Sequence, residues 1–307
     1  MPYAGEAAAL STAILWAFTS MCFSEAAHRV GGFHVNKLRL LFALCIYALV
    51  LFITTGVPIP LGLSQEAVFW LCLSSLIGIV IGDTFIFIAF TSIGPRLTTL
   101  IYASSPIIAT FVAWIFMDEK LGAMDMLGIA LTLGGICWVV AERRPTNGST
   151  DQPQPHHGPH FRRGVMCALG GSLGQAVGLV TSKQALVNTG QAFSPLEGAY
   201  VRILFGFACM LVIGVVRGQI PATIRATRHR EAMLFTLGGT IVGPFLGIWM
   251  SLVAVSLIEA GVAATLNSMV PVFVIPLVIF FKKEHVSKRA IFGSILAVGG
   301  VALLFLN

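Results

Sequence analysis

The chain has 307 residues, of which 56% are hydrophobic and only 10% are charged. An ordinary soluble domain carries about 25% charged residues, so the composition excludes that class and indicates a protein embedded in a lipid bilayer. A net charge of +6 is typical of some nucleic-acid-binding proteins, but the charges of this chain are distributed in a way that has another explanation, and no nucleic acid is expected as a partner.

Ten predominantly apolar stretches follow one another along the chain. Each has 18–23 residues, close to the ~20 that a helix needs to cross a hydrocarbon core of ~30 Å. They are residues 5–24, 38–56, 68–90, 97–117, 124–141, 164–184, 198–216, 232–254, 261–281 and 288–306. The short alternating segments of a β-barrel are absent from the sequence. The sequence therefore predicts an all-α integral membrane protein with ten transmembrane helices.

The basic residues gather on one side of these predicted helices. Sixteen of the nineteen Lys and Arg residues lie at the ends of odd-numbered loops, and the other three are Lys120, Lys183 and Arg202. The positive-inside rule makes the crowded side cytoplasmic, so both termini are expected to be extracytoplasmic. The positive charge thus indicates topology. Lys183 and Arg202 could attract an anion near the exit, or extend to the membrane interface.

One polar segment divides the chain. Residues 142–163 are rich in Pro, Gly and Gln and predict a flexible cytoplasmic linker. The linker separates a first unit, residues 1–141, from a second unit, residues 164–307, with five helices each. Its HHGPH motif fits a solvated linker better than a metal site, and the six cysteines follow no disulfide or metal spacing. No metal or other cofactor is expected.

The two units align without a gap when Pro106 is placed on Pro271, and this is called the repeat alignment below. Between residues 78–135 and 243–300, eleven of 58 positions are then identical, including the proline, one glutamate and five glycines. Because each unit has an odd number of helices, the second enters the membrane upside down. The sequence therefore predicts two inverted five-helix repeats, an arrangement that characterises secondary transporters.

Pro106 and Pro271 each lie about ten residues into a predicted helix. Ten residues span ~15 Å, which reaches the bilayer midplane, and a proline there removes a hydrogen bond and kinks the helix. We expect the two breaks to present polar groups to a solute. The candidates are Tyr102, Ser104, Ser105, Asn267 and Ser268. The alternative is that these prolines only shape how the helices pack.

Asp83 is the candidate for coupling transport to an ion. It lies within roughly 6 Å of the predicted midplane, where an ionisable group costs several kcal/mol unless it is paired or hydrated. Its counterpart in the second unit is Ile248, so the repeat does not require it. Two explanations stay open: a group that couples protons or binds an amine, and an ion pair with Arg39 or Arg96. The motif RLLFAL at Arg39 also has a weaker echo, RILFGF at Arg202.

Two further side chains are expected near the centre of the membrane. Trp16 lies in the middle of the first predicted helix, where it could stack on a ring or a cation of the solute; core packing is the alternative. Gln175 lies at a position roughly equivalent to Ala17 and is expected to line the cavity.

Three features of the sequence are specific enough to indicate a family. They are AILWAF in the first predicted helix, a P-x12-E spacing that begins at Pro106 and again at Pro271, and a pair of glycines in the predicted helices 124–141 and 288–306. They resemble the EamA-type permeases of the drug/metabolite transporter superfamily, and the resemblance covers nearly the whole chain. It implies an inverted-repeat carrier that alternates access. Its members move amino acids, sugars, nucleotide sugars or drugs, often as exporters in bacterial inner membranes.

The sequence and this resemblance together predict a secondary transporter that exports small metabolites such as amino acids across the cell inner membrane, with Asp83 as the candidate for proton coupling and the ion pair as its alternative. A permease for drugs, quaternary amines, sugars or nucleotides is the alternative with the same fold. A membrane-embedded enzyme is disfavoured because all seven histidines lie in predicted loops and one carboxylate lies at mid-membrane. The small solute and the lipid bilayer are the expected partners, as a monomer or a homodimer. The paired glycines, Gly134/Gly135 and Gly299/Gly300, are predicted to let helices approach closely.

Overall fold

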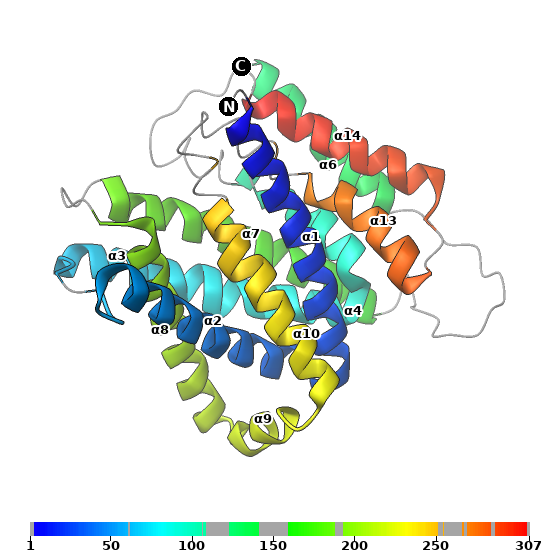
Figure 1. The fold of residues 1–307 in the computed structure, drawn as a ribbon. Coiled ribbons are helices and arrows are strands. Elements are labelled where there is room, and N and C mark those ends of the chain that lie inside the picture. The colour runs from blue at the N-terminus through cyan, green and yellow to red at the C-terminus, as the bar shows by residue number, and fades with distance from the viewer. Residues whose placement is uncertain are drawn as a thin grey trace.

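The computed structural model describes residues 3–60, 62–105, 107–108, 123–140, 159–187, 193–250, 254, 266, 269–283 and 286–305. Within these ranges the chain is helical and contains no strand. The α-helices are α1 (Ala4–Val30), α2 (Gly32–Thr55), α3 (Gln65–Ser74), α4 (Asp83–Tyr102), α6 (Ala123–Val140), α7 (Pro159–Val187), α8 (Pro195–Val216), α9 (Ile220–Ala226), α10 (Arg230–Thr240), α13 (Val270–Lys282) and α14 (Lys288–Phe305), and two π-helical segments are η1 (Ser75–Gly82) and η2 (Ile241–Gly247) (Figure 1).

Several of these helices are long and apolar enough to cross a membrane. Within the described residues there are five such stretches, and two shorter apolar helices accompany them. The five are Ala4–Val30, Gly32–Thr55, Gln65–Tyr102, Leu196–Val216 and Arg230–Met250, and the two are Met126–Trp138 and Val270–Phe281. The helical membrane class is therefore confirmed, and the number of ten spans stays a prediction.

The helix boundaries differ from the predicted spans where glycine makes a tight turn. α1 continues to Val30, beyond its predicted end at residue 24, and a single residue, Gly31 with φ 88°, separates it from α2. The third and fourth predicted spans likewise join at Gly94, with φ 74°, followed by Pro95. Glycine adopts positive φ without strain and proline starts a helix readily. Both helix pairs are thus connected by one residue.

The π-helical segments lie at repeat-related positions. In the repeat alignment η2 falls on residues 76–82, which form all of η1 except its first residue. Both segments end on the repeat-related pair Gly82 and Gly247. A π-helical turn inserts a residue into the helix and is frequent at functional sites. The two units therefore share an irregular helical segment as well as a sequence pattern.

The first helix of each unit contacts the π-helical segment of the other unit. α1 lies against α10 and η2, and α7 lies against α3, η1 and α4 (Figure 1). A Cβ on Gly174 would come within 2.8 Å of the Gly82 Cα, and one on Gly247 would come within 3.1 Å of Trp16 Nε1. These close approaches interlock the two units around η1 and η2.

The last helices of the two units, α6 and α14, lie against each other within the chain (Figure 1). A Cβ on Gly135 would be only 2.6 Å from the backbone nitrogen of Ala297, and one on Gly300 would meet the α6 backbone as closely. By contrast, nothing lies within 4 Å of a Cβ on Gly134 or Gly299. The predicted close approach is confirmed for one glycine of each pair and is wrong for the other.

Candidate functional site

The stretch LIYASSP interrupts its helix. α4 ends at Tyr102, Ala103 and Ser104 form a turn, and Ser105 is helical again. The Ile101 carbonyl accepts hydrogen bonds from the Ser104 backbone nitrogen at 3.0 Å and from the Ser104 Oγ at 2.7 Å. Ser104 is buried and its hydroxyl is bonded to the turn itself, while Ser105 is partly buried. Pro106 lies outside the described residues.

The second proline occupies a comparable place. α13 begins at Val270, directly after Met269 in a turn conformation, and Pro271 lies in the first turn of α13. A proline in the first turn is tolerated because its missing N–H would have no partner within the helix. Asn267 and Ser268 lie outside the described residues. A turn thus stands two residues before Pro271, at Met269, as a turn at Ser104 stands two residues before position 106.

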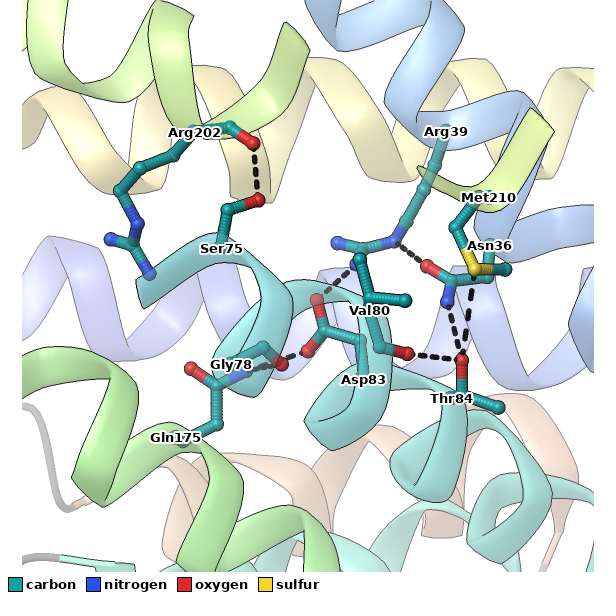
Figure 2. A network of polar contacts seen from close by, with 10 residues as sticks. All are labelled: Asn36, Arg39, Ser75, Gly78, Val80, Asp83, Thr84, Gln175, Arg202 and Met210. Carbon is teal, nitrogen blue, oxygen red and sulfur yellow. Dashed lines mark hydrogen bonds and ion pairs between the residues drawn. The ribbon is translucent and has the colours of Figure 1, made fainter. Parts of the chain in front are cut away.

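Asp83 lies at the junction of the two units. It follows η1 directly, and its Oδ2 pairs with Nη2 of Arg39 from α2 (Figure 2). Its Oδ1 accepts a hydrogen bond of 2.7 Å from Nε2 of Gln175, in α7 of the second unit. The same amide nitrogen lies 3.3 Å from the Gly78 carbonyl oxygen. Both carboxylate oxygens are therefore engaged, and the ion pair expected as one of two explanations is present with Arg39.

Other side chains hold Arg39 in place. Its Nε donates to Asn36 Oδ1 at 2.9 Å, and its guanidinium carbon lies 5.3 Å from the ring centre of Phe87 and 5.7 Å from that of Phe23. The Arg39 side chain is 8% exposed and the Asp83 side chain 16%. A buried pair of this kind is favourable only when hydrogen bonds and ring contacts offset its desolvation. Arg39 has both.

The sequence predicted that Arg202 attracts an anion near the exit or extends to the membrane interface, and the structure places it beside η1. Its carbonyl oxygen accepts a hydrogen bond from Ser75 Oγ in η1 (Figure 2). Its Nη2 lies 3.5 Å from the position that a Cβ on Gly78 would take, and its Nε is buried. Arg202 is within electrostatic reach of Asp83 and Tyr102. The structure therefore places its guanidinium beside η1, and the echo of RLLFAL in RILFGF was the signal that could have linked it to Arg39.

Two more of the predicted site residues lie beside these elements: Tyr102 near Asp83, and Trp16 near η2. Tyr102, the last residue of α4, is 37% exposed and lies within electrostatic reach of Asp83, Arg39 and Arg202. Trp16 contacts η2 at Gly247. The contact of Trp16 in α1 with η2 corresponds to the contact of α7 with η1. Trp16 therefore contacts η2, and Gln175 contacts η1.

Asp83, Arg39, Arg202, Gln175 and Tyr102 are called the charged cluster below. It combines α2 and α4 of the first unit with α7 and α8 of the second. The elements α2, η1 and α8 also pack together through a core of buried apolar residues, including Leu40, Tyr47, Ile79, Ile203 and Met210. Because both units contribute buried charged groups to the cluster, a change of charge in one unit is felt by the groups of the other.

The chain is similar to a known protein family and to a solved structure. The EamA-like transporter family matches residues 3–141 and again residues 162–306. A solved crystal structure has the same fold with a TM-score of 0.59 at 14% identity, over 99% of this chain and 96% of that chain. No curated protein matches significantly. Because the family matches nearly the whole chain, in two copies, the protein belongs to the EamA-like transporter family and is a membrane transporter of the drug/metabolite transporter superfamily.

Proposed function

We propose that this protein is a secondary transporter that exports small polar organic solutes, such as amino acids, across the bacterial inner membrane by alternating access. The observation that carries the proposal is the charged cluster, in which Gln175 of the second unit hydrogen-bonds both Asp83 and the Gly78 carbonyl of the first. Charged groups inside a membrane protein are costly and mark solute or ion pathways.

The proposed architecture has ten transmembrane helices in two inverted repeats, residues 1–141 and 164–307, joined by a cytoplasmic linker at 142–163. The repeat-related positions of η1 and η2 support it. So does Figure 1, in which α1 begins and α14 ends at the same end of the molecule, opposite to α9. A chain that crosses the membrane an even number of times has both termini on the same side, as this arrangement requires.

Protonation of Asp83 is the proposed coupling step. A protonated carboxyl group loses the ion pair with Arg39 and weakens its hydrogen bond with Gln175. The Gln175 contact joins the two units, so protonation loosens the interface that must rearrange when access alternates. A coupling role for Asp83 is compatible with its ion pair, because protonation of Asp83 breaks the pair with Arg39.

The charges in the cluster also bear on the alternative substrates. Arg39 and Arg202 carry two positive charges and Asp83 one negative charge, and both Asp83 oxygens are engaged. A quaternary amine or other cation would meet a net positive site. Polar solutes with an anionic or neutral group fit this cluster better than cationic drugs do.

Counterflow in proteoliposomes tests the proposal. Vesicles that contain the purified full chain are loaded with one unlabelled candidate, and uptake of its labelled form is followed. The panel covers neutral, aromatic, basic and acidic amino acids, sugars, nucleosides and quaternary amines. Uptake above that of protein-free vesicles for an amino-acid class is the expected result. Exchange of quaternary amines alone would contradict the proposed substrates, and no exchange by any class would contradict carrier activity.

A further inference from the structure

The two units carry equivalent arginines, but among the described residues only Arg39 has a carboxylate partner. Arg39 is the eighth residue of α2, and Arg202 is the eighth residue of α8. Arg39 pairs with Asp83. In the repeat alignment, the position that corresponds to Asp83 in the second unit is Ile248, which is apolar. The second unit therefore offers Arg202 no carboxylate at the equivalent place.

The Arg202 side chain has no acceptor among the described residues. Its Nε is buried without a hydrogen bond, and its guanidinium forms no ion pair with any residue in the described ranges. In Figure 2 the dashed line at Arg202 reaches its backbone carbonyl and none reaches its guanidinium. A guanidinium has five N–H donors, and a buried charge without a partner is strongly unfavourable.

The neighbouring acceptors are already used, and the residue beside the guanidinium, Gly78, has no side chain that could pair with it. Asp83 serves Arg39 and Gln175, and the Gly78 carbonyl serves Gln175. The three charged groups of the cluster, two arginines and one aspartate, sum to one positive charge. Gly78 has no side chain, and a Cβ there would have Arg202 Nη2 as its nearest neighbour at 3.5 Å. Part of Arg202 remains accessible although its Nε is buried.

We propose that Arg202 binds a carboxylate carried by the transported solute, so that the solute completes the ion pair that the second unit lacks. The proposal rests on the transport function proposed above and narrows it to amino acids and monocarboxylates. A planar guanidinium holds a carboxylate through two parallel N–H···O bonds. The single positive charge of the cluster is neutralised by one such group. Asp83 contributes no amine site while Arg39 and Gln175 occupy its oxygens.

The test uses probes that share a side chain and differ in one group. Phenylalanine, phenylalanine amide, 2-phenylethylamine and 3-phenylpropionate form one set, and alanine, alanine amide, ethylamine and propionate form a second; inorganic phosphate is added as an anion without a carboxylate. Binding is measured as the rise in the midpoint of thermal unfolding of the purified full chain in detergent. This readout does not depend on transport or on leakage of weak acids through lipid.

We expect the carboxylate-bearing probes to stabilise the wild type. Arg202→Gln should weaken their binding by about 10- to 100-fold, since a hydrogen-bonded charge contact is lost. Arg202→Lys should lose less, because it keeps the charge without the planar fork. Arg228→Gln removes one positive charge from an exposed loop position and serves as the matched control. It should leave binding unchanged.

Two further variants separate a binding role from a structural one. Arg202→Met removes a buried charge that has no ion-pair partner within the described residues, so it should raise the unfolding midpoint of the ligand-free protein while abolishing stabilisation by carboxylates. Gly78→Asp places a carboxylate beside Arg202 and should weaken the binding of carboxylates more than Gly78→Ala does, which adds bulk alone.

The proposal is overturned if no carboxylate-bearing probe stabilises the wild type, if phosphate alone does so, or if Arg202→Gln weakens amides, amines and carboxylates equally. It is also overturned if Arg202→Met lowers the midpoint of the ligand-free protein. Counterflow distinguishes a failure of the carboxylate assignment from a failure of the proposed transport function. Exchange of uncharged or cationic solutes at equal rates by wild type and Arg202→Gln would leave transport standing and remove the carboxylate assignment.

Discussion

The side-chain amide of Gln175 lies within hydrogen-bonding distance of Asp83 Oδ1 at 2.7 Å and of the Gly78 carbonyl oxygen at 3.3 Å. Gln175 belongs to α7 of the second unit, and both acceptors belong to the first unit, with Gly78 in η1 and Asp83 directly after it. The contact exists because η1 ends directly before Asp83 and because Gly174 and Gly82 allow their backbones to approach. It is the polar connection on which the proposed coupling between the units depends.

Replacing Gln175 with Leu should remove this connection at nearly constant volume. Asp83 Oδ1 and the Gly78 carbonyl then lose their shared donor in a buried site, which costs about 1–3 kcal/mol for an unsatisfied group. We expect a lower midpoint of thermal unfolding together with slower gradient-driven transport. Gln65→Leu, at an exposed position at the start of α3, is the control. Equal behaviour of the two variants would contradict a linking role for Gln175.

Neutralising Asp83 separates coupling from stability. Asp83→Asn alone leaves Arg39 buried without its partner, and breaking a buried pair from one side typically costs about 3–5 kcal/mol. The double variant Asp83→Asn with Arg39→Gln removes both charges and should recover most of that stability. If Asp83 carries the coupling proton, the double variant should exchange solute across the membrane but fail to accumulate it against its gradient. Accumulation by the double variant at the wild-type level would exclude Asp83 as the coupling group.

The sequence predicted the features that arise from composition and from residue type. Apolar length predicted membrane helices. The cost of an isolated mid-membrane carboxylate made an ion pair with Arg39 or Arg96 one of the two explanations for Asp83, and the pair with Arg39 is present. The repeat alignment related Gly82 to Gly247. In the structure both glycines end π-helical segments. These inferences succeed because each depends on one residue type and its approximate depth.

The features that the sequence did not predict depend on local backbone geometry. The π-helical segments are invisible in runs that are apolar on every face, because neither a 3.6-residue nor a longer period stands out there. The sequence predicts a loop over residues 91–96 because that stretch is polar and contains Gly94 and Pro95, whereas in the structure Gly94 alone separates the two helices. The place of Arg202 beside Gly78 follows from how α8 lies against η1, which no periodicity encodes.

The prolines give a third prediction. Pro271 lies in the first turn of α13, where it fits the helix, so Pro271→Ala should change stability by less than ~1 kcal/mol. Alanine restores a backbone N–H and removes the proline ring, so a continuous helix through Met269 becomes possible. The turnover or the substrate affinity in counterflow should therefore change several-fold. Pro106→Ala should behave alike if the two prolines frame one site. Pro276 lies inside α13, is exposed and has no proline counterpart in the first unit. If Pro276→Ala altered the kinetics as much as Pro271→Ala, the proline break would have no special role.

Neighbouring glycines of α14 should respond to alanine in opposite ways. A Cβ on Gly300 would lie only 2.7 Å from the Gly128 carbonyl oxygen, against the α6 backbone, whereas a Cβ on Gly299 meets nothing within 4 Å. Overpacking of a close helix contact typically costs about 1–3 kcal/mol, so Gly300→Ala should lower the midpoint of thermal unfolding. Gly299→Ala gains about 0.5–1 kcal/mol of helix propensity without a clash, and its midpoint should stay the same or rise. Because the two substitutions are chemically identical and adjacent, a similar fall in both would mean that α6 and α14 do not make the close contact through Gly300.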